Sequence, residues 1–326
     1  MRDVLVVGAG WAGLTAAARL AAKGYAVTVV EKSRGPGGRS ATRRAGRFEF
    51  DHGAQYLTAS SDAFARQVKA WAAAGLLASW DAGIAVFGRP PDASSSGAGA
   101  RRWVGTPSMN AVPRRLAEGL DCRWRWRAER LAWDGTGWAV TSGEGERLEA
   151  RSLLLTAPPA QSLGLLGDDH PLAGSLSDVE MAPCWALMVG YERAPEIGFD
   201  AAFVNQGPLS WVARMDTRPG RQGAPSWIAH AGPAWSRTQL EAVPERVASL
   251  LLAALGELDV LFTRDVRLLK AHRWRYARGG VSSLSPPLLS RARERLVVAG
   301  DWCAGERIEG AWISGVAAAR RLERLL

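Results

Sequence analysis

The sequence predicts an α/β protein in which a strand-rich domain is inserted into a domain built from both ends of the chain. Residues 4–31 have the pattern of a strand, a tight turn, a helix and a second strand, and residues 295–326 that of a strand, a loop and a helix. The residues between them are rich in short alternating or β-branched segments. We expect 1–60, 101–160 and 290–326 to form the first domain, and 61–100 and 161–289 to form the inserted one.

The individual elements follow from apolar periodicity and from the glycine and proline residues that end each segment. Besides the strands at 4–8 and 25–31, we expect strands or strand groups at 47–53, 123–156, 185–232, 272–278 and 295–301. We expect helices at 14–23, 60–75, 103–120, 236–257 and 310–326. RWRWR at 123–127 is interpreted as a half-buried strand with both tryptophans on one face. Residues 88–100, rich in Gly, Ser and Pro, are interpreted as a surface loop or lid.

Composition narrows the class of protein. The 326 residues are 47% hydrophobic and 22% charged, which is usual for a globular chain. No apolar run approaches the roughly 18 residues that span a bilayer, and no secretory signal is evident, so we expect a cytoplasmic protein without a membrane partner. The three widely spaced cysteines (Cys122, Cys184, Cys303) indicate free thiols and no metal site.

The net charge of +9 comes almost entirely from arginine. These arginines are scattered and form no basic tail, whereas a nucleic-acid-binding protein needs a clustered basic surface. We therefore expect no nucleic-acid partner. An anionic small-molecule substrate is the better match for the charge.

A glycine motif predicts a Rossmann-type dinucleotide site. In Gly8-x-Gly10-x-x-Gly13, the first glycine makes the tight turn, the second allows a pyrophosphate to approach the backbone, and the third allows the helix to pack on the sheet. Glu31 ends the next strand, where a carboxylate can accept hydrogen bonds from ribose hydroxyls and repels a 2′-phosphate. FAD or NAD is therefore expected rather than NADP.

Two further segments favour FAD, bound without a covalent link. After Glu31 and its neighbour Lys32, a second candidate contact, Gly38 permits close backbone approach and Arg39 can neutralise pyrophosphate charge. Near the end of the chain, Asp301 follows a strand and can hold ribityl hydroxyls. The helix after it can direct its N-terminus at the flavin N1/C2=O edge, where negative charge accumulates on reduction. Its first candidate contacts are Glu309, Gly310 and Ala311.

These motifs resemble the flavin amine oxidase superfamily, and within it the renalase-like bacterial flavoproteins. The shared segments include VVGAGWAGLTAA, FDHGAQYLTA and GDWCAGERIEGAWISG, and together they extend from residue 4 to residue 315. The resemblance implies a two-domain fold of the p-hydroxybenzoate hydroxylase type. It also implies that Ala12 and Arg39 contact the FAD phosphates. The residues that would line the isoalloxazine are Gly53, Ala54, Gln55 and Tyr56.

The same resemblance implies an activity. Members of the renalase-like branch oxidise dihydro isomers of NAD(P) to NAD(P)+ and pass the electrons to oxygen, giving hydrogen peroxide. Hydride transfer needs orientation and a dry pocket more than an acid–base pair. Candidate catalytic residues are His230, Trp274 and Tyr276, with His272 on the same strand face; packed core side chains are the alternative interpretation. For Arg214, Arg218 and Arg221, either a phosphate contact or a solvated surface is expected.

Two other functions stay open. An amine oxidase, or a dehydrogenase acting on another small hydride donor, would belong to the same superfamily. Such amine oxidases typically keep a lysine near flavin N5, and Lys270 is the only lysine beyond residue 69. A non-enzymatic module with a structural flavin would bind FAD but would not be reduced by any donor.

Overall fold

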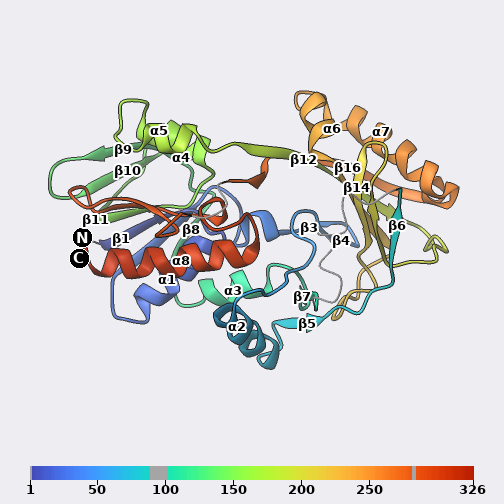
Figure 1. The fold of residues 1–326 in the computed structure, drawn as a ribbon, viewed down its shortest axis with the longest axis horizontal. Helices are drawn as coiled ribbons and strands as arrows, with labels where there is room; N and C mark the ends of the chain where they lie inside the picture. Colours follow the sequence, from blue (N-terminus) through green and yellow to red (C-terminus); the bar gives the residue numbers. More distant parts are fainter. Residues whose placement is uncertain (1, 89–100, 281–283) are drawn as a thin grey trace. The chain divides into compact units, whose positions relative to one another are not determined.

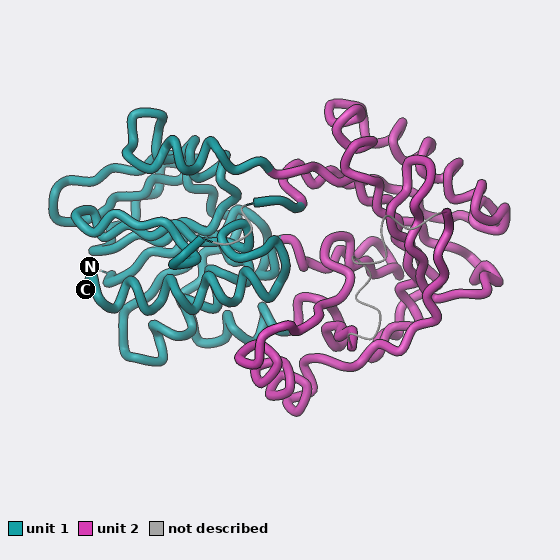
Figure 2. The backbone as a smooth tube through the Cα atoms, in the orientation of Figure 1, with its two compact units in different colours: residues 1–38, 112–180, 278–326 teal, residues 39–111, 181–277 magenta. Residues whose placement is uncertain are grey.

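The computed structural model describes residues 2–88, 101–280 and 284–326. The chain forms two compact units, each built from discontinuous segments (Figure 2). Unit 1 contains residues 1–38, 112–180 and 278–326, and unit 2 contains residues 39–111 and 181–277. Apart from Gly88, the loop expected at 88–100 lies outside the described residues.

The boundaries of the units differ from the predicted ones. Residues 39–60 and 101–111 belong to unit 2, whereas 161–180 and 278–289 belong to unit 1. The side chains explain two of these changes. Phe48 packs so closely on Gly190 that a Cβ there would lie 2.8 Å from its ring, and Leu172 and Leu176 are buried in the core of unit 1. Which unit binds the cofactor and which the substrate stays a prediction.

Unit 1 is a Rossmann-like layer structure. Its sheet has the order β17-β18-β11-β1-β2-β8, with β10 and β9 added beside β11. The strands β18, β11, β1, β2 and β8 are parallel to their neighbours in that order. Their bounds are β1 Arg2–Val7, β2 Val27–Glu31, β8 Asp121–Trp124, β9 Ala128–Trp133, β10 Trp138–Ser142, β11 Arg147–Leu155, β17 Leu289–Arg291 and β18 Leu296–Val298.

Helices cover both faces of this sheet. The valines and leucines of the central strands are buried on both sides, as a parallel sheet requires. On one face α1 (Trp11–Ala21) and α8 (Ile308–Glu323) lie side by side (Figure 1). On the other face lie α4 (Pro159–Leu166) and α5 (Ala173–Ser177). The short helix α3 spans Ala111–Ala117, and the 3₁₀ turns η1 and η3 span Gly38–Ser40 and Asp301–Cys303.

Unit 2 centres on a six-stranded sheet of order β16-β12-β15-β14-β13-β6. Its strands are β6 Ile84–Phe87, β12 Met181–Tyr191, β13 Ala201–Val204, β14 Leu209–Arg214, β15 Ser226–Ala231 and β16 Val266–Gly279. Helix α7 (Pro244–Leu258) and α6 (Pro233–Thr238) pack on this sheet and form one apolar core with it. The remaining elements are α2 Asp62–Ala73, the pairs β3 Thr42–Ala45 with β4 Phe48–Asp51 and β5 Leu77–Ser79 with β7 Trp103–Gly105, and the 3₁₀ turn η2 Val260–Thr263.

Two local predictions are wrong. The helix expected at 103–120 is a strand, β7, followed by a shorter helix, α3, because residues 103–105 pair with β5. The segment 123–127 is not one strand: β8 ends at Trp124, and Arg125 has a left-handed φ of 59°. The chain reverses its alternation there, so Trp124 and Trp126 pack in different cores on opposite faces of the sheet.

None of the three cysteines forms a disulfide bond. None of the helices in the described part of the chain combines the length and the apolar character needed to cross a bilayer.

Candidate flavin site

The turn between β1 and α1 in unit 1 is shaped by its glycines. A Cβ on Gly13 would lie 2.1 Å from the carbonyl oxygen of Gly8 and 2.8 Å from Thr156 Oγ1, so only glycine lets α1 approach β1 this closely. Gly8 has a φ of +112°, which other residues rarely adopt. Gly10 differs, because a Cβ there would meet no protein atom within 4 Å. This open space at the start of α1 fits a phosphate held against backbone amides.

Glu31 secures the same turn. Its carboxylate accepts hydrogen bonds from the amides of Ala9 (2.9 Å) and Ser33 (2.8 Å), and the side chain is buried. Each carboxylate oxygen has a further lone pair, so these bonds leave acceptor capacity for a ribose hydroxyl. The neighbouring Lys32 is exposed and donates to Gln161 Oε1 at 3.3 Å. Glu31 thus has a structural role that the sequence analysis did not predict.

A second glycine pair, Gly37 and Gly38, lies against the turn that contains Gly8 and Gly10. The amide of Gly37 donates to the carbonyl oxygen of Ala9 at 2.9 Å. Gly38, with a φ of +52°, approaches Gly10 so closely that its Cβ would lie 3.3 Å from the Cα of Gly10. The predicted residues Gly8, Gly10, Gly13, Glu31 and Gly38 therefore surround one turn of unit 1.

The end of the chain completes this region of unit 1. A Cβ on Gly315 would lie 2.5 Å from the carbonyl oxygen of Ala12, so α8 touches α1 at the first turn of α1. At the start of α8, a Cβ on Gly310 would lie 2.5 Å from the carbonyl oxygen of Ala304, and the amide of Ala311 donates to Arg307 O. The carboxylates of Asp301 and Glu309 are both buried near the start of α8.

In unit 2, the loop after β4 holds the residues expected to line the isoalloxazine. Gly53 has no room for a side chain: a Cβ would lie 1.9 Å from the carbonyl oxygen of Arg39 and 3.3 Å from Trp274 Cζ2. The amide of Ala54 donates to that same Arg39 oxygen at 2.8 Å, and the Arg39 guanidinium donates to Ala277 O at 2.9 Å. The structure thus brings together four predicted residues, Arg39, Gly53, Ala54 and Trp274.

Three histidines gather at this loop. The ring of His52 lies 4.8 Å from that of His272 and 4.9 Å from that of Trp274. The carbonyl oxygen of His52 accepts a hydrogen bond from Trp274 Nε1 at 2.8 Å and lies 3.3 Å from His230 Nε2. These contacts do not extend to Tyr276, which is half-buried on the same strand. His52 is a site candidate that sequence reasoning missed, although its place in FDHGAQYLTA was a signal.

The histidines are held neutral. Burial lowers the pKa of His52 to about 3, with a further lowering from His272 and from the charge of Arg43. Burial also lowers the pKa of His230 and of His272 to about 4 each. These imidazoles therefore act at neutral pH as uncharged, partly apolar walls.

A buried ion cluster lies directly before the loop. The side chains of Asp51, Arg218 and Arg221 are each 1% exposed, and both guanidinium groups bond to the Asp51 carboxylate. Burial alone would raise the pKa of Asp51, but the charges of Arg218 and Arg221 hold it below its usual value. The expectation of a solvated surface is therefore wrong for Arg218 and Arg221, and a phosphate contact stays a prediction. Arg214 is paired with Asp216 at 2.9 Å.

An aromatic group lies beside this cluster. The rings of Tyr56, Trp80 and Trp211 are 5.7–6.4 Å apart. Arg218 lies over Trp80 at 4.9 Å, and Arg102 lies over Tyr56 at 5.4 Å. One face of each of these two rings is thus already covered by a cation of the protein itself.

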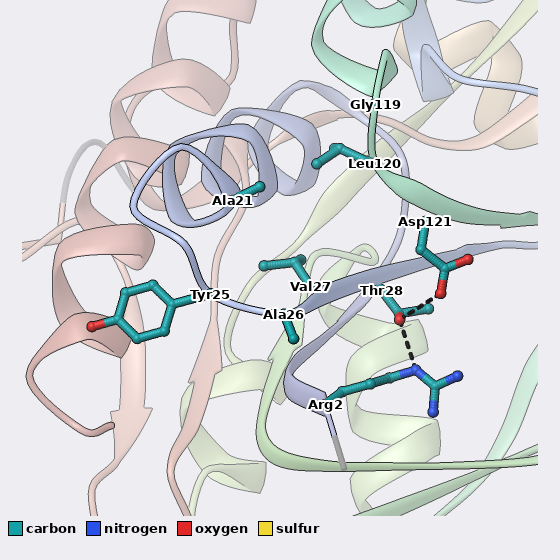
Figure 3. Close-up of a pocket in the computed structure, with 9 residues that line it drawn as sticks. All are labelled: Arg2, Ala21, Tyr25, Ala26, Val27, Thr28, Gly119, Leu120 and Asp121. Atoms are coloured by element: carbon teal, nitrogen blue, oxygen red, sulfur yellow. Dashed lines mark hydrogen bonds between the residues drawn. The ribbon is translucent and has the colours of Figure 1, made fainter.

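A separate pocket of about 590 Å³ opens at the other end of the unit 1 strands (Figure 3). Arg2 donates to Thr28 Oγ1 at 2.7 Å, and Thr28 donates to Asp121 at 2.8 Å. These residues begin or lie early in β1, β2 and β8, whereas the glycine turn follows the carboxyl end of β1. Ligands of open α/β sheets bind at the carboxyl ends, so this pocket is not the dinucleotide site.

Comparison with known proteins agrees with this description. Residues 6–74 match the model of an NAD(P)-binding Rossmann-like domain, and residues 65–322 match that of the flavin containing amine oxidoreductases. Among solved structures, cyclohexylamine oxidase from Brevibacterium oxydans has a TM-score of 0.74 at 16% identity, with 99% of both chains covered. Putrescine oxidase bound to putrescine has a TM-score of 0.74 at 15% identity and the same coverage.

Among curated proteins, the neurosporene-forming phytoene desaturase of Rhodobacter capsulatus is 48% identical over 58 residues. That match covers 18% of this chain and 11% of the desaturase. It concerns only a short common segment. The open space at Gly10 fits a dinucleotide phosphate, and the cofactor of this protein is FAD. The α/β fold, the Rossmann-like unit and the match over most of the chain establish that this protein belongs to the family of flavin containing amine oxidoreductases.

Proposed function

We propose that the protein is a renalase-like oxidase of dihydro isomers of NAD(P). In this reaction the substrate loses a hydride and becomes NAD(P)+, and oxygen takes up the two electrons with two protons as hydrogen peroxide. The bound flavin supplies the hydride-accepting chemistry. The chain's own residues bind and orient the substrate and exclude water.

The observation that carries the proposal is the charge of the side chains around the 52–56 loop of unit 2. Asp51 is neutralised by two arginines, and the three histidines are uncharged at neutral pH. Arg43, which lowers the pKa of His52 and His272 by its charge, adds a further cation. Such surroundings favour an anionic substrate such as a dinucleotide and disfavour a protonated amine.

The aromatic group of Tyr56, Trp80 and Trp211 also disfavours a protonated amine as substrate. A protonated amine can be held by ring faces through cation–π contacts. Here Arg218 and Arg102 already lie over Trp80 and Tyr56, so these faces are not available to a second cation. Lys270 is exposed on β16, which gives no support to a buried lysine of the amine oxidase kind.

We assign roles to the side chains on this basis. Trp274 and His52, whose rings lie 4.9 Å apart and are tilted by 34°, form a neutral aromatic wall against which a dihydronicotinamide ring can pack. His230 holds the loop through the carbonyl oxygen of His52 rather than moving a proton, since its low pKa leaves the imidazole unprotonated and only weakly basic at neutral pH. Gly53, Ala54 and Tyr56 of unit 2 remain predicted contacts of the isoalloxazine, and Asp301, Glu309, Gly310 and Ala311 of unit 1 remain predicted flavin contacts.

The test is anaerobic rapid mixing of the yellow holoprotein with two panels of donors. One panel holds the 2-, 4- and 6-dihydro isomers of NAD and NADP, and the other holds putrescine, cyclohexylamine and related amines. We expect the 2- or 6-dihydro isomers to bleach the flavin faster than the ordinary 4-dihydro form, and oxygen to restore the colour with release of peroxide. Bleaching by amines alone would refute the proposal and favour an amine oxidase. A flavin that no donor reduces would indicate a structural role.

A further inference from the structure

The carboxamide of Gln55 is engaged on all sides within unit 2. Its Oε1 accepts hydrogen bonds from Arg218 Nη2 at 2.7 Å and from Trp211 Nε1 at 3.4 Å. Its Nε2 donates to the carbonyl oxygens of Gly53, at 3.0 Å, and of Asp51. The side chain of Gln55 therefore cross-links the loop to its surroundings through hydrogen bonds rather than offering a free group to a ligand.

Arg218 determines the orientation of the Gln55 carboxamide. A guanidinium group has only donors, so the amide must turn its oxygen toward Arg218. The NH₂ group then faces the carbonyls of Asp51 and Gly53. With the opposite orientation, the NH₂ would meet the guanidinium and the amide oxygen would meet two carbonyl oxygens.

The guanidinium of Arg218 is itself held in place from two sides. Its Nη1 donates to the Asp51 carboxylate at 3.1 Å, and its Cζ lies 4.9 Å from the centroid of the Trp80 ring. Planar, five-donor arginine is suited to bridging two acceptors in this fixed way, whereas lysine is not. The path from Trp80 and Asp51 through Arg218 to Gln55 is continuous and buried.

As a result, three successive carbonyls of the loop are bound by side chains. Gln55 takes those of Asp51 and Gly53, and Trp274 takes that of His52 between them. The backbone of this segment cannot rotate without breaking several buried hydrogen bonds, each of which is costly to leave unmade.

Stability alone does not account for this cluster. One buried carboxylate faces two buried guanidinium groups, and the carboxylate of Glu49, 3.3 Å from Arg221, is partly exposed. Buried ion pairs are often no more stabilising than apolar side chains of the same size. A requirement for one conformation of the 52–56 loop explains the presence of this buried ion cluster.

We propose that Arg218 is a positioning residue, which fixes the orientation of the Gln55 carboxamide and thereby the conformation of the 52–56 loop against which the flavin binds. This inference rests on the proposed assignment of the loop to the isoalloxazine. Because the Arg218 side chain is only 1% exposed, we assign it no contact with the flavin or the substrate. It acts through Gln55.

The experiment compares Arg218→Met, Gln55→Leu and the double variant with Arg221→Met. Arg221 is the matched control, because it is equally buried and bonds to the same carboxylate but makes no contact with Gln55. The readouts are the dissociation constant of FAD, the visible circular dichroism of the bound flavin, and urea unfolding of the apoprotein. None of them requires a substrate, so they remain informative even if dihydronicotinamides do not reduce the flavin.

We expect Arg218→Met and Gln55→Leu each to weaken FAD binding about tenfold, the equivalent of one lost hydrogen-bonded constraint, and to change the flavin circular dichroism alike. The double variant should be no worse than either single one, because both remove the same constraint. Arg221→Met should lower apoprotein stability but leave the flavin signals near those of the wild type.

Several results would overturn the inference. Additive effects in the double variant, or equal flavin changes in Arg221→Met, would show that Arg218 acts through its charge or through general stability. Unchanged flavin signals in Arg218→Met would show that Arg218 does not fix the conformation of the loop. If Arg218→Met does not fold, Arg218→Lys replaces it. Lysine keeps the charge but not the planar group, so wild-type flavin signals in Arg218→Lys would also refute the proposal.

Discussion

The two glycines Gly13 and Gly10 should respond in opposite ways to the same substitution. In Gly13→Ala, the new methyl group would lie 2.1 Å from the carbonyl oxygen of Gly8, whereas ordinary contact begins near 3.4 Å. Helix α1 must therefore move by more than an ångström or the turn must open. Strain of this kind typically costs about 1–3 kcal/mol.

The sign of the effect is informative. Gly13 lies inside α1, and alanine favours a helix over glycine by about 1 kcal/mol where nothing else is in the way. Propensity alone would thus stabilise the variant. We expect the clash to dominate and the melting temperature of the apoprotein to fall by about 5 °C, since 1 kcal/mol corresponds to about 2–4 °C for a domain of this size class.

Gly10→Ala is the matched control. A Cβ there meets no protein atom within 4 Å, and the φ of −81° suits alanine, so the apoprotein should melt at the wild-type temperature. Its methyl group occupies the space of the phosphate, and we expect FAD affinity to fall at least about tenfold. Circular dichroism melting without FAD and quenching of FAD fluorescence measure the two effects. Equal destabilisation of both apoproteins, or unchanged FAD binding in Gly10→Ala, would refute the steric reasoning.

Three further predictions follow from the charged and titrating groups. Asp51→Asn removes the carboxylate that pairs with Arg218 and leaves Arg221 with the partly exposed Glu49, so it should lower the free energy of unfolding in urea by about 3–5 kcal/mol; a loss below about 1 kcal/mol would contradict the buried pairing. His52, His230 and His272 have lowered pKa values in the folded protein, so below the ordinary histidine pKa of 6.5 the unfolded chain binds more protons than the folded one. The free energy of unfolding should therefore have its full value above pH 6.5 and fall progressively toward pH 4. A free energy of unfolding in urea that stays constant over this range would contradict the neutral burial of these histidines. Glu31→Gln leaves one of the amides of the turn facing an NH₂ group, and FAD affinity should fall about tenfold in a fluorescence titration, whereas an unchanged affinity would show that the carboxylate is dispensable.

Much of unit 1 could be predicted because its signals are local. The apolar strand before Gly8, the helix after it and the acidic residue at the end of the next strand all lie within 31 residues. The C-terminal strand and helix were likewise readable from periodicity and turn residues. The error at 123–127 arose because one left-handed residue, Arg125, reverses the alternation, and no local pattern announces it.

The buried cluster of unit 2 could not be predicted in the same way. Asp51 and Arg218 are 167 positions apart, and each alone has the appearance of a surface residue. The helix expected at 103–120 failed for a related reason, since its first residues pair with β5, a strand more than twenty positions earlier. Gln55 was selected as a flavin contact, whereas its amide is fully engaged by the protein.

The packing of Gly315 on Ala12 has a consequence for how the chain folds as it is made. Helix α1, with Leu14 and Leu20, shares an apolar core with α8, a helix that is translated almost 300 residues later. All segments of unit 2 emerge from the ribosome before α8 does, so unit 2 can fold while α1 is not yet packed against α8. Any factor that shields exposed apolar surface during synthesis should therefore act on the first twenty residues of this chain.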